Sequence, residues 1–118
     1  MEASRSSAEI AVAFIEAFAR HDMAAMSGYV AEDIVFESPR GTIEGAAAVL
    51  EAVGQFSQLV AAVKIIAVLG EGTEAMIMYD MVTGSFGTLR AADHLVIRDG
   101  KIVTDRLVFD TFELRKPA

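Results

Sequence analysis

Apolar residues in the first part of the chain recur with the period of a helix. Ile10, Phe14 and Phe18 are four residues apart and form one apolar stripe. The preceding segment, Ser6-Ser7-Ala8-Glu9, has the S-x-x-E form of a capping box, in which a serine and a glutamate satisfy the first backbone amides of a helix. The pattern therefore predicts a helix that begins after Ser6.

The segments up to residue 59 predict a short helix, a short strand, a turn and a third helix. Asp22 can cap the short helix, and Ile34 and Phe36 alternate with polar residues as in a strand. We expect the short helix over 23–30, the strand over 33–37, the turn over 38–41 and the third helix over 45–59.

The second half of the chain is rich in β-branched and apolar residues separated by glycine turns. We expect strands over 63–69, 75–83, 89–98 and 101–110. The last two are joined by Asp99-Gly100, a strong hairpin signal. Helices gathered on one face of such an antiparallel meander make an α+β fold, and residues 1–118 predict a single domain.

Composition adds a hint of a cavity or an interface. Apolar residues make up 53% of the 118 residues, and the mean hydropathy is +0.42, which is high for a small domain. This predicts a well-filled core, with the alternative that some apolar surface lines a ligand cavity or is covered in a homo-oligomer.

Charge and cysteine content narrow the possible partners. The net charge is −7 and no basic cluster is present, which argues against nucleic acid and anionic membranes as partners. The absence of cysteine excludes disulfides and thiolate catalysis. We see no signal-peptide pattern and no apolar stretch long enough to span a bilayer, so we expect a cytoplasmic protein.

Three aspartates on the predicted strands are the candidate chemistry. If the hairpin turns between Phe86 and Gly87, Asp80 faces Asp93. If Asp99-Gly100 forms a turn with a glycine bulge, Asp93 faces Asp105. All three carboxylates would then share one face with apolar neighbours, which are Met76, Met78, Leu89, Ala91, Leu95, Leu107 and Phe109.

Burial and mutual repulsion in such a group should raise the pKa of at least one carboxyl and let two carboxyls share a proton. A carboxylic acid beside a carboxylate can act as a general acid–base pair. The alternative is that these aspartates face solvent or form salt bridges, although the expected register places Arg90 and Arg106 on the opposite face.

Short motifs along nearly the whole chain resemble the NTF2-like superfamily, and its SnoaL-like domains in particular. The motifs are Phe18-Ala19-Arg20-His21-Asp22, Ala31-Glu32-Asp33-Ile34-Val35-Phe36, Ser38-Pro39 with Gly41 and Gly45, Ile97-Arg98-Asp99-Gly100-Lys101-Ile102, and Phe109-Asp110. The resemblance implies a conical pocket between a curved sheet and the helices, and frequent homodimers that form through the outer face of the sheet.

The resemblance covers several activities, including ketosteroid isomerases, limonene epoxide hydrolases, polyketide cyclases, scytalone dehydratases and non-catalytic members. Compared with the ketosteroid isomerases, Asp93 matches a protonated aspartate, but Phe14 replaces a tyrosine and Ser38 replaces the basic aspartate. Ketosteroid isomerase activity is therefore not expected.

The match to limonene epoxide hydrolases is also partial. Asp80 matches one catalytic aspartate, whereas Met78 and Leu107 replace the arginine and the second aspartate. Each of the two sites is thus present only in pieces.

Two functional hypotheses remain open. The first is a cofactor-independent isomerase, cyclase, dehydratase or hydrolase acting on a small apolar or oxygenated organic ligand, with Asp80 and Asp93 as catalytic residues. The second is a non-catalytic ligand-binding or dimerisation module. Two histidines far apart in sequence argue against a metal. The expected pocket residues are Phe14, Phe18, Tyr29, Ser38, Met78, Asp105, Leu107 and Phe109, and the expected dimer surface surrounds Tyr79, His94, Thr104 and Arg106.

Overall fold

The computed structural model describes residues 6–116 and forms one six-stranded sheet with four helices. Residues 1–5 and 117–118, the two ends of the expected domain, lie outside the described residues. The helices are α1 (Ser7–Ala19), α2 (Met23–Ser27), α3 (Ala46–Ser57) and α4 (Phe112–Arg115). The strands are β1 (Val30–Ser38), β2 (Gly41–Glu44), β3 (Val60–Glu71), β4 (Glu74–Thr83), β5 (Thr88–Arg98) and β6 (Lys101–Phe109).

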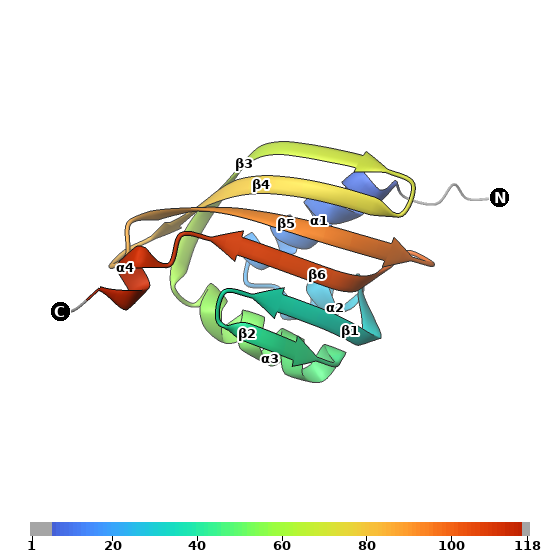
Figure 1. The fold of residues 1–118 in the computed structure, drawn as a ribbon, viewed down its shortest axis with the longest axis horizontal. Coiled ribbons are helices and arrows are strands. Elements are labelled where there is room, and N and C mark those ends of the chain that lie inside the picture. The colour runs from blue at the N-terminus through green and yellow to red at the C-terminus, as the bar shows by residue number, and fades with distance from the viewer. Residues whose placement is uncertain (1–5, 117–118) are drawn as a thin grey trace.

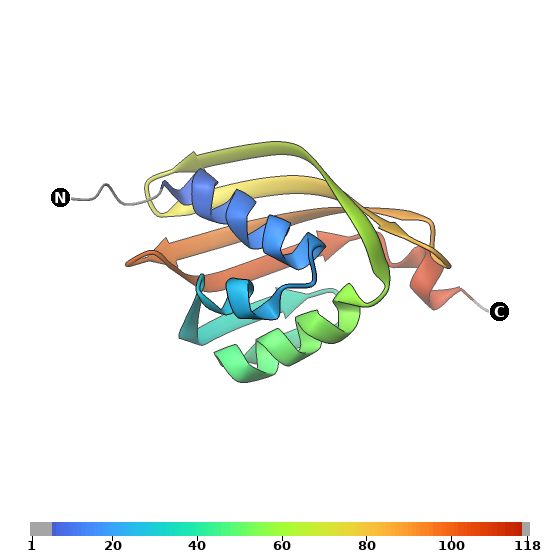
Figure 2. The ribbon, with the colours of Figure 1, turned by 180° about the vertical axis from the view of Figure 1, so that it is seen from behind.

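The strand order is β2-β1-β6-β5-β4-β3, and the sheet curves along its length (Figure 1). Strands β3 to β6 form the expected antiparallel meander, and β1 pairs with β6 in parallel. Helices α1, α2 and α3 all lie on one face of the sheet, as Figure 2 shows from behind. The expected α+β class is therefore confirmed.

Local capping fixes the start of the first two helices. The Glu9 amide donates to Ser6 Oγ at 3.1 Å, and the Ser6 amide donates to Glu9 Oε1 at 2.8 Å, which confirms the capping box. Asp22 Oδ1 accepts from the Ala25 amide at 3.0 Å. Helix α2 is shorter than expected, because the chain enters β1 at Val30.

Two elements were not expected from the residue pattern. Strand β2 has only four residues and is defined by its pairing with the end of β1. Helix α4 is a single turn that follows β6. Both are too short to carry a periodic pattern of their own.

The register between β4 and β5 differs from the expected one by three positions. Asp80 faces Arg90, and Asp93 faces Ile77, so the expected pairing of Asp80 with Asp93 is wrong. The turn is centred on Ser85 because the Thr83 side chain closes a longer loop, with Oγ1 donating to the Gly87 carbonyl at 2.6 Å. An odd shift moves the side chains of one strand to the other face relative to its partner.

The register between β5 and β6 differs by two positions, which keeps the same faces together. Asp93 faces Leu107, and Asp105 faces Leu95, so the direct pairing of Asp93 with Asp105 is also wrong. Asp99 and Gly100 both have positive φ, at 53° and 75°, as in a two-residue hairpin turn. The bulge lies at Val103 instead of at the glycine.

The inner face of the sheet packs against the helices and supplies most of the core. Along β4 the buried side chains are those of Ala75, Ile77, Tyr79, Met81 and Thr83. Those of Met76 and Met78 face outward and are exposed, so the expected placement of both on the acidic face is wrong. No helix among residues 6–116 is long and apolar enough to cross a membrane.

Candidate functional site

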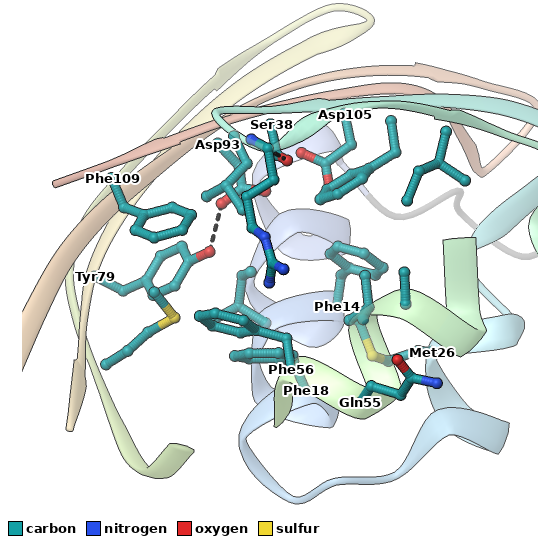
Figure 3. Close-up of a pocket in the computed structure, with 18 of the residues that line it drawn as sticks. Phe14, Phe18, Met26, Ser38, Gln55, Phe56, Tyr79, Asp93, Asp105 and Phe109 are labelled. Atoms are coloured by element: carbon teal, nitrogen blue, oxygen red, sulfur yellow. Dashed lines mark hydrogen bonds between the residues drawn. The ribbon is translucent and has the colours of Figure 1, made fainter. Parts of the chain in front are cut away.

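A cavity of about 460 Å³ lies between the inner face of the sheet and helices α1 and α3. Phe14 and Phe18 reach it from α1 and Phe56 from α3, while the sheet supplies the opposite wall (Figure 3). The lining residues are Phe14, Ile15, Phe18, Met26, Phe36, Ser38, Arg40, Ile43, Ala52, Val53, Gln55, Phe56, Leu59, Tyr79, Met81, Asp93, Asp105, Leu107 and Phe109. Most are apolar, as is usual in pockets that bind small organic molecules.

Three polar side chains are grouped on the sheet wall of this cavity. Tyr79 on β4 donates its hydroxyl to Asp93 Oδ1 on β5 at 2.5 Å (Figure 3). Asp105 on β6 is the diagonal neighbour of Asp93 and lies on the same face. Both aspartates are only 2% exposed. The cavity therefore contains a buried acid pair with a phenol hydrogen-bonded to one member.

The burial of these groups determines their protonation. Burial raises the pKa of Asp105 well above its ordinary value, and the neighbouring Asp93 carboxylate raises it further. Burial also raises the pKa of Asp93, whereas hydrogen bonds with Asp105 and Tyr79 lower it in part. Two carboxyls this close titrate as a pair, and Asp105 is the member that retains a proton more strongly.

Burial also raises the pKa of Tyr79 well above its ordinary value, and the charge of Asp93 raises it further. The phenol therefore remains a hydrogen-bond donor. Asp105 Oδ1 is buried and has no hydrogen-bond partner within the described residues. A buried oxygen without a partner is costly unless a ligand or water supplies one, and this oxygen belongs to a residue of the cavity wall.

Asp80 lies outside the cavity, on the outer face of the sheet. Arg90 donates to both of its carboxylate oxygens, at 2.9 and 3.1 Å. The hydrogen bond from Arg90 lowers the pKa of Asp80, so this carboxylate is ionised and already paired. The expectation that Arg90 lies on the opposite face from Asp80 is wrong, and it fails because of the register shift.

The expected pocket residues divide into two groups. Six of them line the cavity, namely Phe14, Phe18, Ser38, Asp105, Leu107 and Phe109. Tyr29 and Met78 are not among the residues that line it. Met78 lies on the outer face of β4, and Tyr29 lies just before β1, where its carbonyl accepts from the Ile102 amide at 2.7 Å.

Tyr79 is the site residue that the sequence pattern misplaced. Its expected position was the outer dimer surface, but it is buried on the inner face and bonded to Asp93. Tyr79 alternates in step with Ala75, Ile77 and Met81, which are all buried on the inner face of β4. Assigning these three apolar residues to the inner face would have placed Tyr79 there as well. His94 and Arg106 do lie on the outer face, where Arg106 Nη1 contacts His94 Nδ1 at 3.3 Å.

Residues 6–116 contain no group of three or more metal-ligating side chains with the arrangement of a metal site. The chemistry that the cavity itself can supply is proton transfer and hydrogen bonding by Asp93, Asp105 and Tyr79. A raised carboxyl pKa is what a general acid needs near neutral pH.

Comparisons with known proteins agree with this architecture. A crystal structure from Kribbella flavida is 31% identical, with a TM-score of 0.90, and the match covers 94% of this chain and 92% of that one. An NTF2-like protein of unknown function from Cytophaga hutchinsonii is 19% identical, with a TM-score of 0.81 and coverage of 98% and 100%.

A second Kribbella flavida structure, provisionally named a ketosteroid isomerase, is 19% identical, with a TM-score of 0.76 and coverage of 95% and 82%. At this identity the likeness concerns the fold alone. None of the curated proteins matches the chain significantly. The family model for the SnoaL-like domain matches residues 11–104, and the chain therefore belongs to the SnoaL-like family, with an NTF2-like fold.

Proposed function

We propose that the protein is a cofactor-independent acid–base catalyst for a small, mostly apolar organic molecule that carries an oxygen function. The observation that carries this proposal is the buried pair of Asp93 and Asp105 on the wall of an apolar cavity of about 460 Å³. A cavity of this size accommodates a molecule of about ten to twenty non-hydrogen atoms.

The roles of the two carboxyls differ. Asp105 holds the shared proton and has a free oxygen, so it is placed to hydrogen-bond the oxygen function of the substrate and to protonate it. Asp93, which accepts from Tyr79, is the carboxylate that removes a proton from carbon. Asp80, expected as a catalytic residue, has no role in this proposal because it lies on the other face of the sheet.

Isomerisation and dehydration both balance with this pair. In a dehydration, Asp93 takes the proton from carbon, the carbon–oxygen bond breaks, and Asp105 gives its proton to the departing hydroxyl, which leaves as water. The pair ends with its one proton on Asp93, and transfer to Asp105 restores the starting state. Because no electrons are gained or lost, no redox cofactor is needed.

The first test is a carboxyl-detected NMR titration of the wild type and of the Asp93→Asn, Asp105→Asn and Asp80→Asn variants. In the wild type we expect one carboxyl of the pair to titrate far above the ordinary value of about 4. In Asp93→Asn and Asp105→Asn, the carboxyl that remains should titrate in a single uncoupled step. Asp80→Asn is the matched control and should leave both signals in place. Two independent, ordinary titrations would refute the acid pair.

Homodimerisation through the outer face of the sheet is a second proposal, which the family resemblance also implies. No helix of residues 6–116 covers this face, and several of its apolar side chains are exposed: Leu69 at 75%, Val108 at 63%, Met76 at 49%, and Met78 and Val82 at 39% each. Exposed apolar patches of this kind mark interfaces in soluble proteins.

Sedimentation equilibrium tests this second proposal. Val108→Asp should shift a dimer towards the monomer, because it places a charge on the outer face of the sheet, which the partner would bury. Ala48→Asp, which places the same charge at an exposed position of α3 that does not line the cavity, is the control and should not shift it. A wild type that is monomeric at all concentrations contradicts the dimer and leaves the acid pair unaffected.

A further inference from the structure

Two arginines line the cavity or the hollow that adjoins it. Arg40, in the turn between β1 and β2, lines the cavity and also a second hollow of about 320 Å³ that adjoins it. Arg115, on α4, lines the second hollow. We refer to this second space as the outer hollow, and its lining residues are Pro39, Arg40, Phe56, Leu59, Phe86, Thr111, Leu114 and Arg115.

Neither arginine has a carboxylate partner among the described residues, in contrast to three basic residues of the sheet and the C-terminal segment. Arg90, Arg106 and Lys116 are each paired with an aspartate or glutamate. Within residues 6–116, neither Arg40 nor Arg115 forms a salt bridge, and Arg115 Nε donates only to Thr111 Oγ1 at 2.7 Å.

The charges around the combined space are arranged with opposite signs at its two ends. The only carboxylates among the described lining residues are Asp93 and Asp105, which are buried on the sheet wall. The outer hollow is lined by two guanidinium groups and no acid. Because the chain has a net charge of −7, a hollow lined by two arginines and no acid is not a consequence of composition.

The distance between the two ends is set by one strand. Phe36 on β1 faces Asp105 on β6, and Arg40 follows Phe36 by four residues. Extended backbone advances by about 3.3 Å per residue, so Arg40, in the turn just after β1, is at most about 13 Å from Phe36 along the chain. The side chain of Arg40 lines the same cavity and shortens this span.

We propose that the substrate is an apolar carboxylic acid, whose carboxylate is held at the outer hollow by Arg40, with Arg115 nearby, while its oxygen function reaches Asp105. The guanidinium group binds carboxylates through two parallel hydrogen bonds. A neutral or cationic ligand would gain nothing from the positive charge of Arg40, which is exposed to solvent. This inference deepens the proposed function and rests on it, because it assigns the far end of the ligand to the acid pair.

Calorimetric titration of a homologous series of para-hydroxyphenyl alkanoates tests this assignment. Each acid is compared with its methyl ester, and each para-hydroxyphenyl compound with the phenyl compound that lacks the hydroxyl. The proteins are the wild type, Arg40→Gln and Arg98→Gln. Arg98 is an exposed arginine at the end of β5 that does not line either space, and its variant is the matched control.

We expect the best acid of the series to bind the wild type roughly tenfold or more tightly than its ester, as for a hydrogen-bonded charged group. Arg40→Gln should reduce the affinity for the acid to that for the ester, and Arg98→Gln should change neither. Equal binding of acids and esters to the wild type would overturn the inference, as would an equal loss of both in Arg40→Gln.

The hydroxyl comparison separates this inference from the proposed function. If the hydroxyl adds nothing to affinity while acids still bind more tightly than esters, the acid pair does not contact the ligand, and the proposed function fails. If the hydroxyl adds affinity but the carboxylate does not, the acid pair is supported, and the assignment to Arg40 is overturned.

Discussion

Replacing Asp105 with asparagine should stabilise the protein at neutral pH. In the folded state Asp105 is buried with one oxygen unpartnered, and its pKa is raised well above the ordinary value, first by burial and then by Asp93. In the unfolded chain the same carboxyl ionises freely with a pKa of about 3.9. Keeping the carboxyl protonated, or burying its charge, therefore costs free energy that asparagine does not cost.

The sign and the size follow from proton binding. Between the unfolded and the folded pKa of Asp105, the folded state binds more protons than the unfolded state, so the free energy of unfolding falls as pH rises. The stability that the wild type gains from the proton on Asp105 is fully present below the unfolded pKa of this carboxyl. It is lost as pH rises through the folded pKa. For one proton the slope is at most about 1.4 kcal/mol per pH unit.

The assay is urea unfolding, followed by circular dichroism, over a pH range from below the ordinary aspartate pKa to neutrality. The difference in unfolding free energy between Asp105→Asn and the wild type should be small at the acid end and should grow in favour of the variant as pH rises. Taking this difference removes the contributions of titrating groups that do not contact Asp105, whereas that of Asp93, which titrates together with Asp105, remains in it.

Asp80→Asn provides the control with the opposite sign. Arg90 lowers the pKa of Asp80, so Asp80 contributes stability above its unfolded pKa, and this contribution is lost as pH falls through its folded pKa. If the stability curves of Asp105→Asn and the wild type run parallel across the whole range, Asp105 does not retain its proton on folding, and the reasoning is refuted.

Two further changes test the neighbourhood of the site and the packing of α1. Tyr79→Phe removes the hydrogen bond to Asp93, so the pKa of Asp93 should rise in the NMR titration. The unfolding free energy at neutral pH should fall by about 2 kcal/mol. An unchanged pKa of Asp93 would contradict this hydrogen bond. Gly70→Ala would place a Cβ 2.6 Å from Ser7 Oγ, so urea unfolding should show a loss of about 1–3 kcal/mol, whereas Gly84→Ala, with no atom within 4 Å, should not match that loss.

Much of the fold could be predicted from short stretches of sequence. The capping box at Ser6 and Glu9, the apolar stripe of α1 and the Asp99-Gly100 turn each depend on residues within a few positions of one another. Such signals are strong because few residue types can cap the first backbone amides of a helix, and few can adopt the positive φ angles of a tight turn. The antiparallel meander and the α+β class follow from these elements.

The candidate site could be predicted only in part. Asp93 and Asp105 were placed on one face, since a shift of two residues between β5 and β6 preserves the alternation of side chains. A shift of three residues between β4 and β5 reverses the alternation of side chains. Asp80 therefore lies on the outer face and Tyr79 on the inner face, each opposite to the face expected from the sequence. The loop that causes this shift is closed by Thr83, whose hydroxyl bonds give no recognisable pattern in the sequence.

The sequence by itself determined the types and order of the elements other than β2 and α4, and the presence of acidic residues among apolar strands, because these depend on local preferences and on period. Only the tertiary structure decided which acids meet. The joining of Tyr79, Asp93 and Asp105 at one cavity depends on the pairing of three strands and on the helices that bury them. Burial, which raises the pKa values of both aspartates, is a property of that packing and of no single segment.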